Sequence, residues 1–102
     1  MVDERYVTED TVEEHLRKRC KAARGLCIKM NPFGVRGIPD RLVLLPGAVI
    51  AFFELKRPKG GSYEPLQERW HTKLRKLGFR VYVSNTKASV DAAMEELCSK
   101  GM

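Results

Sequence analysis

Hydrophobic positions along the chain follow a helical period in some segments and a strand period in others, and they predict seven elements in the order α-β-β-β-α-β-α. The first is a helix that Thr8 caps, with Glu9 and Asp10 in the first turn, where the helix dipole favours acidic groups. Gly25 is predicted to end this helix. Its apolar stripe comprises Val12, Leu16, Cys20 and Ala23.

Three apolar runs follow the helix and predict strands at residues 26–30, 41–45 and 49–55. Pro46-Gly47-Ala48 separates the last two runs, which indicates a hairpin with a short loop that contains glycine. Both faces of these two runs are apolar, and such strands normally lie in a sheet that is covered on each side. We therefore expect helices to pack above and below the sheet.

The second half of the chain predicts a helix, a strand and a last helix. Pro65 suits a first helical position, and Gly78 is expected to end a helix with the stripe Leu66, Trp70, Leu74 and Leu77. A strand follows at residues 79–84, and a helix at about 89–98 buries Val90, Ala93, Met94 and Leu97. Because a helix separates strands 49–55 and 79–84, the right-handed crossover rule predicts that they are parallel.

Length and composition predict one domain across residues 1–102, because a chain this short builds one compact core. Lys and Arg number 19 against 13 Asp and Glu, a formal charge of +6 that attracts polyanions such as nucleic acids. Charge alone does not separate nucleic-acid binding from simple solubility. The net charge supports nucleic-acid binding only together with a motif for catalysis.

Cysteine usage and the N-terminal segment indicate an intracellular protein. Cys20, Cys27 and Cys98 lack the spacing of zinc ligands, so we expect buried free thiols in a reducing compartment. Residues 1–8 lack the basic start and apolar run of a signal peptide, and no apolar stretch is long enough to cross a membrane. The expected location is the cytoplasm.

Paired carboxylates are the first sign of chemistry. If Leu45 pairs with Val49 across the hairpin, Asp40 lies opposite Glu54 on the same face, with Cβ atoms about 5 Å apart. Two such carboxylates repel unless a cation lies between them or one binds a proton, and oxygen ligands of this kind suit Mg²⁺ or Mn²⁺. Lys56 follows Glu54 by two residues and shares its face. This set fits phosphodiester hydrolysis.

A Glu-x-Lys pair at a strand end is often only a solvated surface pair. Here Phe52, Phe53 and Leu55 surround it and make this strand the most apolar in the chain. Ionised groups in such a strand are costly unless they are paired or bind metal. The functional interpretation of Glu54 and Lys56 is therefore favoured.

Four segments together resemble the virus-type replication-repair nuclease domain, VRR-NUC, of the PD-(D/E)xK nuclease superfamily. They are GIPDR at 37–41, FELKRP at 53–58, PLQ at 65–67 and LGFRVYV at 77–83. Each segment is short, but their order and spacing are specific and the resemblance covers most of the chain. It implies an α/β, restriction-endonuclease-like αβββαβ core with a central mixed sheet flanked by helices.

The resemblance also implies a metal-dependent DNA endonuclease. Asp40, Glu54 and the backbone carbonyl of Leu55 match the ligands of Mg²⁺, for which Mn²⁺ substitutes. Lys56 matches the lysine that assists the attacking water, and Gln67 matches a glutamine that supports the site from the next helix.

Related nucleases contribute a further glutamate from the first helix. At 100° per residue, Glu13 flanks the apolar stripe, whereas Glu14 points towards solvent. We therefore expect Glu13 to be the catalytic and metal-binding glutamate. The alternative is that Glu13 is an ordinary acidic residue of a first helical turn.

Basic residues near the expected site are candidates to bind DNA phosphates. They are Lys29, Arg36, Arg41, Arg57 and Lys59. His15 and His71 lie on predicted helices, and we expect surface or half-buried positions for both, without catalytic function. Trp70 has core spacing and is expected to pack.

Stand-alone viral and bacterial proteins of this type resemble Holliday junction resolvases. The resemblance therefore implies cleavage of branched DNA in repair or recombination, by a homodimer whose two sites cut two strands, in a bacterial or phage-infected cytoplasm. The alternatives are a monomeric flap or nonspecific nicking nuclease, a catalytically silent nucleic-acid-binding module and a basic structural domain. The set of Asp40, Glu54, Lys56 and Gln67 argues against the last two, because pure binding needs no paired carboxylates.

Overall fold

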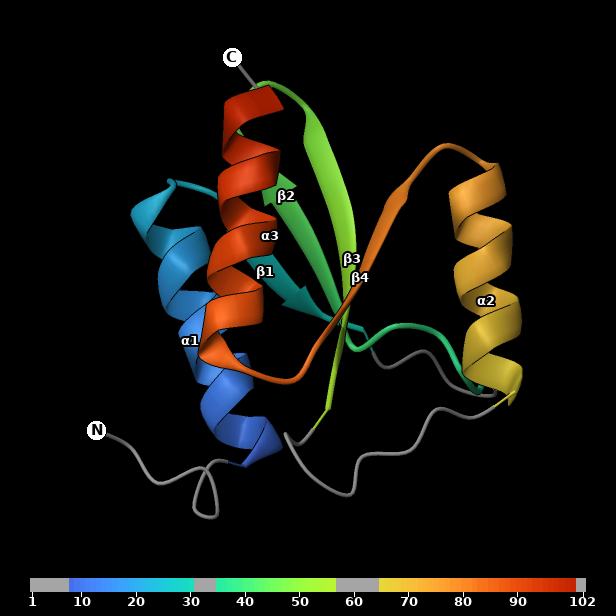
Figure 1. Ribbon diagram of the computed structural model, residues 1–102. Coiled ribbons are helices and arrows are strands. Elements are labelled where there is room, and N and C mark those ends of the chain that lie inside the picture. Colours follow the sequence, from blue (N-terminus) through green and yellow to red (C-terminus); the bar gives the residue numbers. More distant parts are fainter. Residues whose placement is uncertain (1–7, 31–34, 57–64, 101–102) are drawn as a thin grey trace.

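The computed structural model describes residues 8–30, 35–56 and 65–100 (Figure 1). The elements are α1 (Glu9–Ala22), β1 (Leu26–Lys29), β2 (Arg41–Leu45), β3 (Val49–Leu55), α2 (Pro65–Lys76), β4 (Arg80–Ser84) and α3 (Lys87–Lys100). Their order is the one that the hydrophobic pattern predicts. In the described part of the chain, no helix is both long and apolar enough to span a membrane.

The four strands form one mixed sheet in the order β1-β2-β3-β4. β1, β2 and β3 pair antiparallel, and β4 lies parallel to β3, which confirms the crossover prediction. Leu45 pairs with Val49, the register expected from the hairpin, and the ladder continues to Arg41 opposite Phe53. The next step along both strands places Asp40 opposite Glu54.

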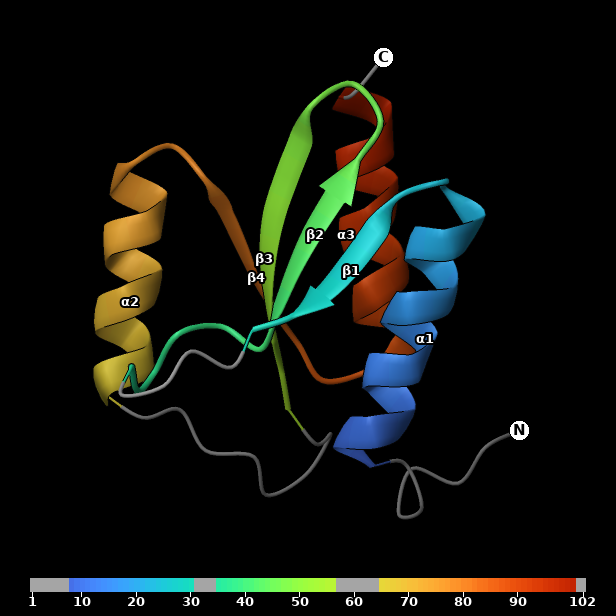
Figure 2. The ribbon, with the colours of Figure 1, turned by 180° about the vertical axis from the view of Figure 1, so that it is seen from behind.

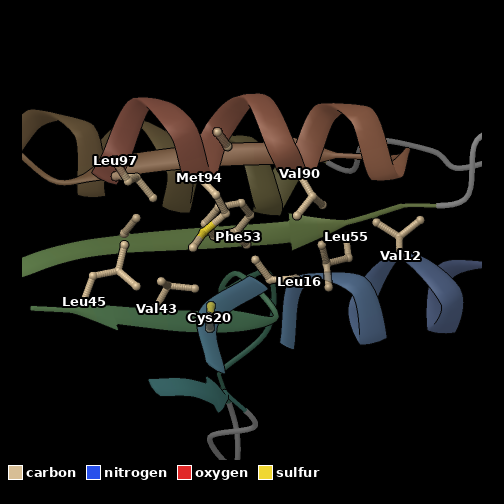
Figure 3. Close-up of a cluster of buried hydrophobic side chains, with 12 residues drawn as sticks. Val12, Leu16, Cys20, Val43, Leu45, Phe53, Leu55, Val90, Met94 and Leu97 are labelled. Atoms are coloured by element: carbon tan, nitrogen blue, oxygen red, sulfur yellow. The ribbon is translucent and has the colours of Figure 1, made fainter. Parts of the chain in front are cut away.

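α1 and α3 cover one face of the sheet, and α2 covers the other (Figures 1 and 2). Between the sheet and the α1/α3 pair lies the larger core, whose side chains Figure 3 shows. It comprises Val12, Leu16, Cys20, Val43, Leu45, Ala51, Phe53, Leu55, Val90, Ala93, Met94 and Leu97. Since β3 contributes every second residue to this core, Glu54 points to the opposite face.

The α2 face has a smaller core of Phe52, Leu74 and Val81, against which Trp70 packs as predicted. His71 is fully buried, so the expectation of a surface or half-buried position is wrong for this residue. Leu77 is 73% exposed and lies beyond the end of α2, which contradicts its predicted place in the stripe. The buried side of α2 carries His71 and Leu74, and the helix is therefore rotated from the expected stripe.

The N-terminus of α1 is capped as predicted, because the Thr8 side chain accepts a hydrogen bond from the backbone N–H of Thr11 at 3.2 Å. The C-terminus of α1 differs from the one that the sequence predicts. Arg24, with φ 62°, occupies the left-handed conformation that the sequence assigns to Gly25. A Cβ at Gly25 would lie 2.4 Å from the carbonyl oxygen of Leu44, so this glycine permits close approach of β2 instead.

α3 begins two residues earlier than expected. The backbone N–H of Ser89 donates to Thr86 Oγ1 at 3.0 Å, and the N–H of Thr86 donates to Ser89 Oγ at 3.1 Å. This reciprocal pair places the cap at Thr86, whereas the apolar pattern alone marks only Val90 as the first buried position.

The three cysteines are free thiols, as expected, but their burial differs. Cys20 is buried in the larger core, Cys27 is half-buried on β1 and Cys98 is exposed on α3. The expectation of a buried thiol is therefore wrong for Cys98, which lies one residue beyond the buried stripe that Leu97 ends.

Candidate active site

Asp40 directly precedes β2 and Glu54 is the second-last residue of β3, so the register of the two strands brings their carboxylates together. Asp40 Oδ2 accepts a hydrogen bond from the backbone N–H of Leu55 at 2.9 Å. The side chain of Glu54 is only 3% exposed. The hairpin register thus produces the carboxylate pair that the sequence predicts, and the backbone of β3 anchors one member of it.

Lys56 and Gln67 both contact the same oxygen of Glu54. Lys56 Nζ lies 3.4 Å from Glu54 Oε2, and Gln67 Nε2 donates to that oxygen at 3.1 Å. The other oxygen, Oε1, is buried and has no hydrogen-bond partner among the described residues. A buried carboxylate oxygen without a donor is costly, so this atom needs a proton or a cation.

The pKa of Glu54 also indicates that the carboxylate pair binds a proton or a cation. Burial, followed by the negative charge of Asp40, raises the pKa of Glu54 to about 8, although Lys56 opposes the shift. At neutral pH the carboxylate pair therefore retains a proton when no cation is bound. A divalent cation between the two carboxylates would take the place of that proton.

The donor atoms around this point are suited to a hard cation. Asp40 and Glu54 supply carboxylate oxygens, and the backbone carbonyl of Leu55 is the additional oxygen that the resemblance implies. Among the residues with described positions, no three Asp, Glu, His or Cys side chains form a metal-binding group. Two carboxylates with further water ligands are a usual protein environment for Mg²⁺, so the residues present fit this ion.

Glu13 pairs with Arg41, the residue that follows Asp40. Its Oε1 is 2.8 Å from Nη2 of Arg41, and this hydrogen bond lowers the pKa of Glu13. Arg41 is buried, and its Nη1 also donates to the backbone carbonyl of Cys27 at 3.4 Å. Glu14 is exposed, as predicted, and pairs with Lys18 at 3.6 Å. The helix facing was thus predicted correctly, but Glu13 contacts Arg41.

Glu9, an exposed residue at the start of α1, is a further candidate for the first-helix glutamate, which the sequence interpretation did not consider. Partial burial and then the charge of Asp40 raise the pKa of Glu9, whereas Lys56 lowers it. Glu9 precedes Glu13 by four residues, so both lie on one helix face, one turn apart. That spacing was the available signal, but a first-turn Glu is also explained by the helix dipole alone.

The segment before Asp40 is held against the start of α2. Gly37 has φ 86°, and a Cβ there would lie 2.8 Å from the backbone of Leu66. This close approach requires glycine and places Asp40 and Gln67 relative to each other.

His71 lies on α2, one turn after Gln67. Burial and then the positive charges of Arg75 and Lys56 lower the pKa of His71, so this buried imidazole is neutral at pH 7.

The predicted phosphate-binding residues have different positions. Lys29 and Arg36 are exposed, whereas the guanidinium of Arg41 contacts Glu13 and the backbone of Cys27. Arg57 and Lys59 lie outside the described residues. Lys29 and Arg36 are therefore the members of this set that the described structure presents to solvent.

Comparison with models of known protein families gives no match. The chain is 40% identical over 83 residues to a protein of Acyrthosiphon pisum secondary endosymbiont phage 1 named "Putative nuclease p44", a match that spans 81% of this chain and 88% of the phage protein. A solved structure described as "VRR_NUC domain" superimposes with a TM-score of 0.80 at 37% identity, covering 85% of this chain and 94% of that one. The chain belongs to the VRR-NUC family. Its mixed four-stranded sheet with flanking helices is the restriction-endonuclease-like fold of that family, as the sequence predicts.

Proposed function

We propose that this VRR-NUC nuclease is a Mg²⁺-dependent endonuclease that hydrolyses phosphodiester bonds in DNA. The observation that carries the proposal is the pair of buried Glu54 and half-buried Asp40, in which one oxygen of Glu54 contacts Lys56 and Gln67 while the other has no donor in the described structure. A structural ion pair would satisfy both oxygens. An incompletely satisfied carboxylate pair fits a site that takes up a cation.

Asp40, Glu54 and the backbone carbonyl of Leu55 would hold Mg²⁺, or Mn²⁺ in its place. When bound, such an ion supplies Lewis-acid polarisation of a phosphate oxygen and lowers the pKa of a coordinated water. Gln67 holds Glu54 Oε2 and so leaves Oε1 for the cation. The ammonium group of Lys56 would orient the attacking water and offset negative charge on the phosphate.

The first-helix glutamate is tested by a pair of variants, Glu9→Gln and Glu13→Gln. Because Glu9 responds to Asp40 and Lys56, Glu9→Gln is expected to slow cleavage by about 10- to 100-fold without loss of stability. Glu13→Gln should lower the free energy of unfolding by about 1–3 kcal/mol, because it weakens the ion pair of the buried Arg41. Single-turnover cleavage rates and urea unfolding measure both effects.

Glu14→Gln is the matched control, since Glu14 is exposed and, among the described residues, pairs with Lys18 alone. It should leave both cleavage and stability close to wild type. If Glu13→Gln slows cleavage more than Glu9→Gln at equal stability, Glu13 is the functional glutamate, as the helix facing alone suggests.

The proposed substrate is branched DNA, with a homodimer cutting two strands of a four-way junction. This part of the proposal rests on the likeness to junction resolvases and on the net charge of +6, which favours a polyanionic partner. A monomeric flap or nicking nuclease is the alternative within the enzyme class. A catalytically silent DNA-binding module is the alternative outside it.

One experiment separates these three hypotheses. Purified protein is incubated with Mg²⁺ or Mn²⁺ and with linear, flap and four-way DNA of matched sequence, and its mass is measured by light scattering. We expect junction cleavage by a species of twice the chain mass. Cutting of the flap alone by a monomer would support the flap nuclease, equal cutting of all substrates by a monomer would support the nicking nuclease, and DNA binding without cleavage would support the silent module.

A further inference from the structure

α1 and β1 enclose a surface groove of about 330 Å³ that the predicted catalytic residues do not line. Arg17, Lys18 and Lys21 form its helical wall, together with Glu14. Leu26 and Cys27 of β1 line the opposite side. The groove therefore combines three cationic side chains with a single carboxylate.

The charge of this groove is available to a ligand. Lys18 lies 3.6 Å from Glu14 and offsets its negative charge. The other ion pairs of α1 within the described residues are Glu13 with Arg41, and His15 and Arg19 with Asp91. Arg17 and Lys21 are exposed and take part in none of them. Two cations without an ion pair among the described residues thus line a concave surface, which suits an anion.

The groove leads away from the catalytic carboxylates. β1 ends at Lys29, and the backbone N–H of the next residue, Met30, donates to the carbonyl oxygen of Asp40 at 2.8 Å. Leu26, at the other end of β1, lies at the far end of the groove. Lys29 is exposed, and its positive charge and that of Arg17 both act on Glu13. A basic track therefore runs from the site, past Lys29, to Arg17 and Lys21.

The length of this track can be compared with DNA. At about 1.5 Å of helix rise per residue, Arg17 lies roughly 12 Å and Lys21 roughly 18 Å along α1 from Glu9. Phosphates of one DNA strand advance about 3.4 Å along the duplex axis per base pair. For a DNA strand that runs along α1 from Glu9, Arg17 and Lys21 thus lie about four and five base pairs further on.

We propose that the α1–β1 groove binds the phosphate backbone of a DNA arm about four to five base pairs from the scissile bond, through Arg17 and Lys21. This inference rests on the proposed function, because it assumes that DNA is cut at Asp40 and Glu54. Basic residues in the last turn of α1 suit the helix dipole, which accounts for Lys21. The dipole does not account for Arg17 in mid-helix or for Lys29 on a strand.

The test measures DNA affinity against arm length, in Ca²⁺ or chelator so that no cutting occurs. Duplexes carry a central junction or nick, and each arm is extended separately from about three to about eight base pairs. Wild-type protein should gain about tenfold in affinity when one arm passes four to five base pairs. Arg17→Ala with Lys21→Ala should lose that gain, and its slope of log affinity against log salt should fall by about two.

Two variants make the result specific. Lys73→Ala with Lys76→Ala on α2 removes the same charge from another exposed helix and should keep the gain with arm length. Arg17→Lys with Lys21→Arg preserves the charge and should also keep it. Both groove residues are exposed, so thermal unfolding of the Ala variant should match wild type.

The two proposals fail in different ways. If wild type binds DNA without dependence on arm length, or if the α2 variant loses the gain to the same extent, the groove proposal is wrong even when cleavage is observed. If arm-dependent binding requires Arg17 and Lys21 but no divalent cation supports cleavage, the groove stands and the proposed enzymatic function is wrong.

Discussion

Glu54→Gln is expected to reduce DNA cleavage by at least about 10³-fold, because it removes a charged ligand from the site where a cation would act on the phosphate. Glutamine has the same shape, so it can still accept a hydrogen bond from Gln67 while its amide group faces Asp40. The substitution removes a buried negative charge and its repulsion by Asp40, the two causes that raise the pKa of Glu54. The metal-free variant should therefore be more stable than wild type at pH 8.

Single-turnover cleavage in Mg²⁺ and urea unfolding in chelator measure the two effects on the same protein. Asp40→Asn is the companion variant, since its side-chain oxygen can still accept the hydrogen bond from the N–H of Leu55. It should lose cleavage to a similar extent and keep DNA binding. Wild-type cleavage by either variant would show that the catalytic carboxylates lie elsewhere.

The second large effect is a fall in the stability of the metal-free protein as the pH rises from about 4.5 to about 8. These are the ordinary pKa of a glutamate and the raised pKa of Glu54 in the folded protein. Between them the folded state retains a proton that the unfolded state has lost, so the free energy of unfolding decreases with pH. Below this range the contribution of Glu54 is complete, and above it the contribution is lost.

The decrease should total roughly 3 to 5 kcal/mol if Glu54 is its source. Urea unfolding in chelator at several pH values measures it, and Glu54→Gln serves as the control because it cannot titrate. Addition of Mg²⁺ at pH 8 should raise the free energy of unfolding of the wild-type protein but not that of the variant, since a bound ligand stabilises the folded state. Parallel pH profiles of the two proteins would contradict the electrostatic account of the site.

The local sequence pattern determined the strand pairing of this protein and the residues at the centre of its site. The three-residue loop Pro46-Gly47-Ala48 sets the pairing of Leu45 with Val49, and that pairing alone places Asp40 opposite Glu54. The strand period then places Lys56 beside Glu54. The helix between β3 and β4 dictates their parallel pairing. Each of these relations depends on neighbours in the chain or on the handedness of the backbone.

Tertiary packing decided how the helices are positioned against the sheet. Glu9 and Glu13 share one face of α1, so periodicity cannot distinguish them, and their positions differ by about one turn, or 5.4 Å, along the helix axis. That position is set by contacts of Val12, Leu16 and Cys20 with strand residues far away in the sequence. The pairing of Arg41 with Glu13 depends on the same packing of α1, and the burial of His71 depends on the packing of α2 against the other face of the sheet. Sequence alone gives the direction in which a side chain points, but contacts between distant segments decide what it meets.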